Sequence, residues 1–387
     1  VRRTNGQAAD SFDIGAGHIA PNTAVDPGLV YDNGFADHAA YLCGLDEPPF
    51  SASECAAHAA AGFSSEAVDL NLPSIASSGL ISGDAVRRRV TNVGPPATFT
   101  AEIAPPANLD VVVEPTTLVL DTGETAEFQV RFLDRGATRD SWAFGELAWR
   151  SATHRVASPL AARPVTLRAP AELFLRGRQG NATLPVAFGY GGGYGATVHG
   201  LRQPTLDANG QVPTGFVDDD PTNVFSFRLD NGVAGHSFTV PPNQIYLRIS
   251  LFDELTDGAD DLDIYLFFCV NNQCSQLAQS DGITSDEEIN IFQPVPGEYL
   301  VLVHGYETDQ VAGGPGANYS LFTWAFGNND IVGNLSITAP ATVGNGDRFD
   351  FPLQWSTLEP ASRYLGAVSH TTPAGLYGLT IVNVVTP

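Results

Sequence analysis

Short apolar runs with a period of two, separated by Gly and Pro, constrain the fold of this chain most. In the run at 124–132 the apolar side chains fall on one face of a strand and the polar ones on the other: Ala126, Phe128, Val130 and Phe132 against Glu127, Gln129 and Arg131. The same alternation recurs at 245–251 and at 262–268, and 39 Gly and 27 Pro are spread between such runs. This pattern predicts a mainly β protein with two antiparallel β-sandwiches.

The runs divide the chain into three expected parts. Residues 1–62 are irregular, with one short helix predicted at 37–42. Residues 63–168 and 169–387 each contain a series of strand-like runs, so each is expected to form a sandwich. The strands after residue 328 are expected to pack on that same second sandwich rather than to form a fourth domain.

Residues 12–44 carry a family resemblance. The stretch FDIGAGHIAPNTAVDPGLVYDNGFADHAAYLCG resembles the closing segment of the catalytic domain of subtilases, the subtilisin-like serine proteases, in their cucumisin-like branch. In that family the nucleophile precedes this segment in a G-T-S-M-A motif, which this chain lacks. The resemblance implies that residues 1–62 are the end of an α/β catalytic domain, that no catalytic residue lies in the chain, and that Ala39, Ala40 and Leu42 pack on a missing catalytic core.

Two further resemblances concern the sandwiches. Residues 88–94 (RRVTNVG), 113–120 (VEPTTLVL) and 144–159 (FGELAWRSATHRVASP) are similar in order and spacing to the fibronectin type III-like domain that follows the catalytic domain in subtilases. Residues 260–266 (DDLDIYL) and 296–303 (PGEYLVLV) resemble the bacterial pre-peptidase C-terminal (PPC) domain of secreted proteases. This resemblance implies that the second sandwich is jelly-roll-like. Together they imply the accessory C-terminal region of a secreted serine endopeptidase.

The charge limits the class of partner. Lys and Arg total 19 against 43 Asp and Glu, a net charge of −24, which excludes nucleic acid because phosphate binding needs clustered cations. The sequence contains no run of eighteen apolar residues, the length needed for a helix to span a membrane. The expected partners are the catalytic domain of the same protease and protein substrates.

Four cysteines form two close pairs in the sequence, Cys43 with Cys55 and Cys269 with Cys274. The spacing CVNNQC suits a disulfide across a hairpin tip, and the first pair would close a small loop. Zinc ligation and free thiols are the alternatives, but a zinc site needs two such pairs near each other or nearby His ligands, and these pairs are over two hundred residues apart. Disulfides indicate an extracellular location.

Asp257, Asp260, Asp261 and Asp263 are the candidate metal ligands. Asp261 and Asp263 lie two apart in a predicted strand, so both leave the same face, and neighbouring carboxylates repel unless a cation separates them. Calcium would suit such oxygen ligands. The alternative is a solvated acidic face, and the runs 218–220 and 286–288 are expected to be plain surface.

The sequence does not decide between two classes of function for residues 169–387. These residues could extend the protease structurally, or serve as a substrate-binding, glycan-binding or secretion module released from the protease. Trp142, Trp149, Trp324 and Trp355 could stack on sugars, although Trp149 shares a strand face with Leu147 and is expected in the core.

Overall fold

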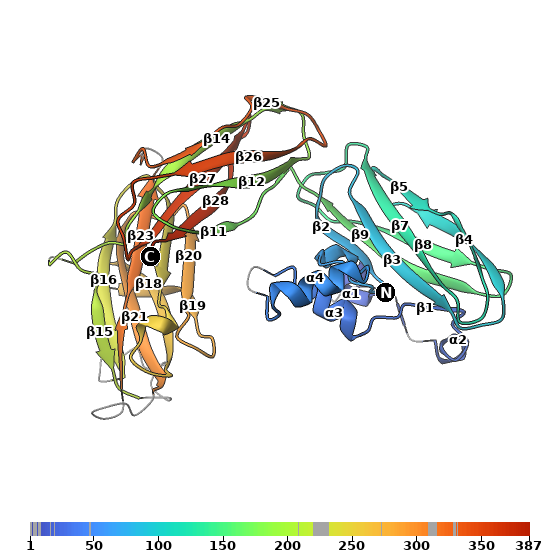
Figure 1. Cartoon of the computed structure of the whole chain (residues 1–387), viewed down its shortest axis with the longest axis horizontal. Coiled ribbons are helices and arrows are strands. Elements are labelled where there is room, and N and C mark those ends of the chain that lie inside the picture. Colours follow the sequence, from blue (N-terminus) through green and yellow to red (C-terminus); the bar gives the residue numbers. More distant parts are fainter. Residues whose placement is uncertain are drawn as a thin grey trace. The chain divides into compact units, whose positions relative to one another are not determined.

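The computed structural model describes residues 2, 6, 9–15, 17–18, 20–45, 48–207, 209–219, 232–271, 273–308, 316–327, 330 and 332–387. Its sheets are mostly antiparallel, and the mainly β fold expected from the sequence is confirmed (Figure 1). The chain forms two compact units. Unit 1 comprises Val1–Ala169, Val186–Gly193 and Thr342–Phe349, and unit 2 comprises Pro170–Pro185, Tyr194–Ala341 and Asp350–Pro387.

Most of unit 1 is a sandwich of two sheets. One has the order β1 (Leu29–Val30), β3 (Ala85–Asn92), β7 (Thr125–Asp134), β5 (Leu109–Glu114). The other has the order β2 (Ile75–Leu80), β9 (Arg155–Pro164), β8 (Ala143–Arg150), β4 (Ala97–Ala104), β6 (Thr117–Leu120), with only β2 and β9 parallel. Phe128, Val130 and Phe132 of β7 are buried between the sheets, so the alternation predicted for this strand is confirmed. Trp149 is fully buried and its ring meets that of Phe128 edge-on, with the centroids 5.1 Å apart.

Short helices precede this sandwich: α1 (Ser11–Ile14), α2 (Pro21–Ala24), α3 (Phe35–Leu42), α4 (Ala52–Ala60) and the 3-10 turn η1 (Ala67–Asp69). The helix predicted at 37–42 is present as α3. Ala39 and Ala40 are 1% and 2% exposed within this chain, so the expectation that they pack on a missing catalytic core is wrong. The reason is that α3 packs against α4, and that β1 joins the edge of the sandwich beside β3.

The middle of unit 2 is a second sandwich. Its sheets have the orders β16 (Val233–Val240), β21 (Gly297–Glu307), β18 (Asp261–Val270), β19 (Gln273–Ser280), and β20 (Glu288–Phe292), β17 (Gln244–Ser250), β23 (Phe322–Gly327), beside the pair β15 (Thr214–Val217) and β22 (Ala317–Ser320). A 3-10 turn, η3 (Asp253–Leu255), follows β17. The core contains Leu247 and Ile249 of β17 facing Leu262, Ile264 and Leu266 of β18. Cys269 and Cys274 are directly opposed in the β18–β19 hairpin and form a disulfide, as their spacing predicted. Asn272 lies outside the described residues.

The strands after residue 328 do not extend those sheets. They pair instead with strands that precede the middle sandwich, in the orders β10 (Leu167–Arg168), β12 (Gly180–Phe188), β26 (Arg348–Trp355), β24 (Leu335–Ile337), and β11 (Glu172–Arg176), β28 (Gly375–Val385), β27 (Arg363–Thr372), β14 (Gly195–Arg202). A further pair, β13 (Gly192–Gly193) with β25 (Thr342–Val343), belongs to unit 1. The middle sandwich is therefore inserted between β14 and β24.

The sheet β20-β17-β23 is covered on both faces. Its second face, with Phe322, Trp324 and Phe326, packs on Leu365 and Ala367 of β27. The outward-facing positions that alternation assigned to β17 are consequently buried, because a second sheet covers them.

Buried Arg248 of β17 shows how this covered face tolerates a charge. Its side chain is 2% exposed and its guanidinium makes two hydrogen bonds to Glu172 of β11, at 2.8 and 2.6 Å. Glu288 lies 3.1 Å away. A buried cation is stable only with such partners.

Candidate functional site

The helical segment, defined here as the described residues of 9–63, is fastened to strand β3. The Arg89 guanidinium donates a hydrogen bond of 2.6 Å to Asp37 in α3, and it lies 5.3 Å from the ring centroid of Phe63. Asn71 bridges the same elements: its amide donates to the carbonyls of Asp32 at 2.8 Å and Arg89 at 3.1 Å, and its Oδ1 accepts from the Arg89 N–H at 2.7 Å. These groups hold α3 against the sandwich.

The neighbouring Arg88 is buried and fixes the connection between the helices and β2. It is 4% exposed, and its guanidinium donates to four backbone carbonyls: Val68 at 2.6 Å, Arg87 at 2.7 Å, Leu72 at 2.9 Å and Ser74 at 3.0 Å. Burial lowers the pKa of the Arg88 guanidinium to about 10. The fork of donors in arginine suits several acceptors at once, which gives a physical reason for this residue at the start of the RRVTNVG motif.

The stretch DPGLVYD at 26–32 contacts the turn between β8 and β9, and β9 itself. Asp26 Oδ1 lies 3.0 Å from His154 Nε2, and the Tyr31 and Ser158 hydroxyls share a hydrogen bond of 2.7 Å. Gly28 has a positive φ of 75°, and a Cβ there would lie 2.8 Å from the His154 ring. Two sequence motifs that carry separate resemblances are thus packed directly on each other.

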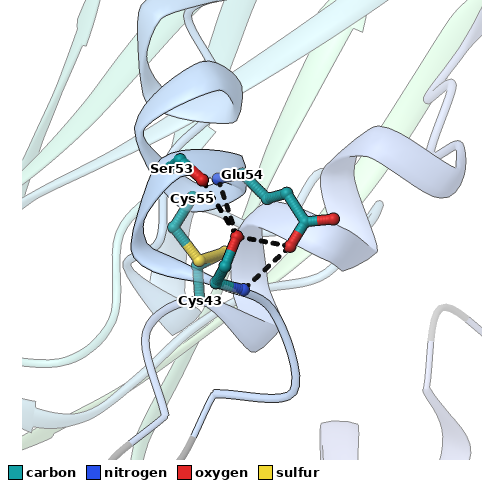
Figure 2. Close-up of a disulfide and its surroundings, with 5 residues drawn as sticks. Cys43, Ser53, Glu54 and Cys55 are labelled. Carbon is teal, nitrogen blue, oxygen red and sulfur yellow. Dashed lines mark hydrogen bonds between the residues drawn. A yellow bond between two sulfur atoms is a disulfide. The ribbon is translucent and has the colours of Figure 1, made fainter.

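A disulfide links the two longer helices of this segment (Figure 2). Cys43, at the end of α3, is bonded to Cys55 in α4 with a Cα–Cα distance of 5.6 Å. Beside it, Ser51 caps α4: its N–H and hydroxyl donate to Glu54 at 2.9 and 2.6 Å, and the Glu54 N–H donates back to the Ser51 hydroxyl at 3.4 Å. This capping box explains why the alanine-rich stretch there is helical. All four cysteines of the chain are paired.

Although it is well anchored, the helical segment exposes large apolar side chains. Val25 is 84% exposed, Phe35 78%, and Phe12 59%. The Phe12 ring also contacts the rings of Trp142 and Phe144, with centroid distances of 4.8 and 5.2 Å. We call these three side chains, Phe12, Val25 and Phe35, the exposed apolar set.

The candidate metal ligands lie in unit 2 and have different surroundings. Both oxygens of Asp257 are engaged by Asn318, which donates from its backbone N–H at 2.7 Å and from its side-chain amide at 2.6 Å. Asp260 is 4% exposed, and its carbonyl accepts from the Ser285 hydroxyl at 2.8 Å. These two residues do not share one ligand shell with the next pair.

Asp261 and Asp263 begin strand β18, and only the first is partly exposed. Asp263 is 4% exposed, and its Oδ2 lies 3.3 Å from both His304 Nδ1 and the Tyr265 hydroxyl. Burial, followed by the charges of Asp263 and Glu307, raises the pKa of the Asp261 carboxyl, and its buried Oδ1 has no hydrogen-bond partner. Among the described residues no three His, Cys, Asp or Glu side chains come together as a metal site.

The other acidic runs are not all surface. Glu287 is 2% exposed and accepts hydrogen bonds from the Ser280 hydroxyl and the Gly282 N–H; burial is the main cause that raises its pKa. The expectation that residues 286–288 are plain surface is therefore wrong for Glu287. In the run 218–220, Asp219 accepts from the Thr308 N–H at 2.9 Å, and Asp220 lies outside the described residues.

Comparison with known proteins fits this arrangement. The sequence profile of the fibronectin type-III domain matches residues 69–162. The chain is 36% identical over 168 residues to the subtilisin-like protease SBT5.3 of Arabidopsis thaliana, a match that covers 41% of this chain and 21% of that protein. It is 37% identical over 157 residues to a subtilisin-like protease of Glycine max, covering 39% of this chain and 20% of that protein.

Solved structures overlap with the chain only weakly. The match to the secreted serine protease VesC from Vibrio cholerae covers 63% of this chain and 48% of VesC, with 10% sequence identity and a TM-score of 0.19. This TM-score is too low to carry an argument. In the part of the chain that is described, no helix is both long and apolar enough to cross a membrane.

The chain therefore contains a fibronectin type III-like sandwich that carries a disulfide-linked helical segment. Over about two-fifths of its length it is homologous to plant subtilisin-like proteases, and it spans about a fifth of the length of these relatives.

Proposed function

We propose that this chain is the non-catalytic C-terminal region of a secreted subtilisin-like serine endopeptidase. The parent protein would hydrolyse peptide bonds with an Asp-His-Ser triad outside this chain. The helical segment and the fibronectin-like sandwich would stabilise the catalytic domain and aid access of protein substrates. Two disulfides support an extracellular location.

The exposed apolar set carries this proposal. Phe35 is exposed in α3, which Arg89 and the Cys43–Cys55 disulfide anchor. Val25 is exposed beside Asp26, whose carboxylate lies 3.0 Å from His154 Nε2. Burying one such side chain contributes about 1.5–3 kcal/mol, and a rigid support avoids the entropy of ordering a loop on binding. The occupant that fits is the catalytic domain of the same protease, because the shared stretch is only 21% of the length of the protease SBT5.3.

The inserted sandwich at 214–327 is the part for which we propose a PPC-like identity. The support is its position after the fibronectin-like domain and its DDLDIYL and PGEYLVLV strands, which lie side by side as β18 and β21. As the alternative, unit 2 is a substrate- or glycan-binding or secretion module that is released from the protease.

Calcium at the start of β18 is a further part of the proposal. Asp261 has a buried oxygen without a partner, and its pKa is raised, so a nearby cation would relieve an unfavourable environment. Asp257 is a weaker candidate because Asn318 occupies both of its oxygens. A site here would need carbonyl and water ligands in addition.

Labelling with a serine-directed fluorophosphonate tests the non-catalytic role. The chain, produced alone and folded, is expected to show no labelled serine and no casein hydrolysis, with a subtilisin as positive control. Stoichiometric labelling of one serine in the chain would contradict the proposal.

A further inference from the structure

We propose that a pocket at one end of the β12-β26-β24 sheet in unit 2 binds a neutral saccharide. The pocket has a volume of about 410 Å³, within the range of small-ligand sites. It lies where β12 begins, β26 ends and β24 begins. Nothing in the homology to proteases assigns a ligand to it, and the proposal does not depend on the catalytic partner proposed above.

The lining is polar but carries no charge. Although 16% of the residues in the chain are charged, none lines the pocket. Its side chains include four carboxamides and two hydroxyls: Gln179, Asn181, Asn334, Gln354, Ser336 and Ser356. A lining without charge does not favour an ionic ligand, because the pocket offers no partner to compensate the desolvation of a charge.

Three of the carboxamides are available for a ligand. Gln179, Asn181 and Gln354 are exposed, and no hydrogen bond to another described residue engages their side chains. Asn334 is instead part of the framework: its amide donates to the Leu201 carbonyl at 2.8 Å, and its Oδ1 accepts from the Leu201 N–H at 2.9 Å. Free carboxamides are thus set around a fixed one.

The framework under the pocket is buried. Leu335 and Trp355 also line it but are only 4% and 6% exposed, because they pair with each other on the buried face of the sheet, whereas Ser336 and Gln354 pair on the exposed face. The Trp355 Nε1–H donates to the Gly177 carbonyl at 3.0 Å, which fixes the ring. Gly180 lies against that ring so closely that a Cβ would be 2.4 Å from it, so only glycine keeps this wall in place.

This combination matches a sugar better than a peptide. Each sugar hydroxyl donates and accepts a hydrogen bond, as do the carboxamide and serine side chains on the exposed face of the pocket. An extended peptide would instead add to an unpaired strand edge through its backbone. Here the free groups are side chains above the ends of three neighbouring strands.

Calorimetric titration of the full chain tests the proposal. The ligands are the neutral cellotriose and maltotriose, the charged trigalacturonate, and a blocked trialanine peptide. Saturable binding of at least one neutral saccharide is expected, and Asn181→Ala and Gln354→Ala should each weaken it about tenfold, the effect of one or two lost hydrogen bonds. Thr183→Ala is the matched control, because Thr183 is exposed two residues along β12 but does not line the pocket.

Three results would overturn the proposal. They are no saturable binding of either neutral saccharide by the wild-type chain, an equal loss in Thr183→Ala, or tighter binding of trigalacturonate or of the peptide. Melting temperatures of the variants equal to that of the wild type ensure that a loss of binding is local.

Discussion

Replacing Arg88 by Met is expected to destabilise unit 1 strongly. Methionine keeps an apolar stem of similar length but removes the donors that satisfy four carbonyls. Hydrogen bonds from a charged group contribute about 1.5 kcal/mol or more each, so the four together give about 6 kcal/mol. Burial of the charge opposes them: the pKa of Arg88 falls from 12.5 to about 10, equivalent to about 3 kcal/mol. A net loss of about 3 kcal/mol remains.

Differential scanning calorimetry of the full chain measures this loss. For a domain of this size, 3 kcal/mol corresponds to a decrease of about 6–12 °C in the melting temperature of unit 1. Arg87→Met is the matched control, because Arg87 is half exposed and makes one ion pair with Asp69, worth at most about 1 kcal/mol. If the Arg88 and Arg87 variants melt within about 2 °C of each other, the anchoring role of the buried guanidinium is refuted.

Two further perturbations concern unit 2. Excess calcium is expected to raise the melting temperature by several degrees relative to chelator, because a ligand at a hundred times its dissociation constant stabilises the folded chain by about 2.7 kcal/mol. The double variant Asp261→Asn, Asp263→Asn should abolish this difference. Equal melting temperatures of the wild type in calcium and in chelator would argue against the site. The His370 ring is buried between the Tyr194 and Thr380 hydroxyls, and burial lowers its pKa from 6.5 to about 4. As the pH falls from 6.5 to 4, the imidazole is therefore protonated only in the unfolded chain. The free energy of unfolding should fall by up to about 3 kcal/mol over this pH range. Carboxylates with raised pKa values, such as those of Asp261, Glu287 and Glu288, make the folded chain more stable as the pH falls and so oppose this effect. The measurement is therefore urea unfolding of the wild type and of His370→Gln at several pH values. An identical dependence of the unfolding free energy on pH in the two proteins would contradict the role of His370.

Local features of the sequence could be predicted because each depends on residues close together in the chain. The faces of β7 follow from the period of two at Ala126–Phe132, and both disulfides follow from cysteines twelve and five residues apart. The fibronectin-like sandwich carries motifs in a fixed order, so a resemblance over short stretches identified it.

What the sequence did not reveal depends on distant partners. The alternation of β17 assigns Arg248 to solvent, and only the sheet formed by residues from both ends of unit 2 buries it against Glu172. The RRVTNVG motif was recognised, but its contacts through Arg88 and Arg89 join elements that no periodicity connects. The saccharide pocket likewise brings together residues 179–181, 333–336 and 354–356.

The most direct test of the account is an interface variant in the parent protein, for which we propose protease activity. The exposed side chains Val25 and Phe35 are replaced together by Ser, with Ile283→Ser, a 91% exposed apolar residue of unit 2, as the matched control. Loss of two buried apolar side chains is expected to weaken the contact between the catalytic domain and the helical segment by about 3 kcal/mol or more. The half-life of protease activity at elevated temperature would then be shorter than in the wild type. The control should have the half-life of the wild type. Equal half-lives for the wild type, Val25→Ser/Phe35→Ser and Ile283→Ser would contradict a catalytic domain docked on the helical segment.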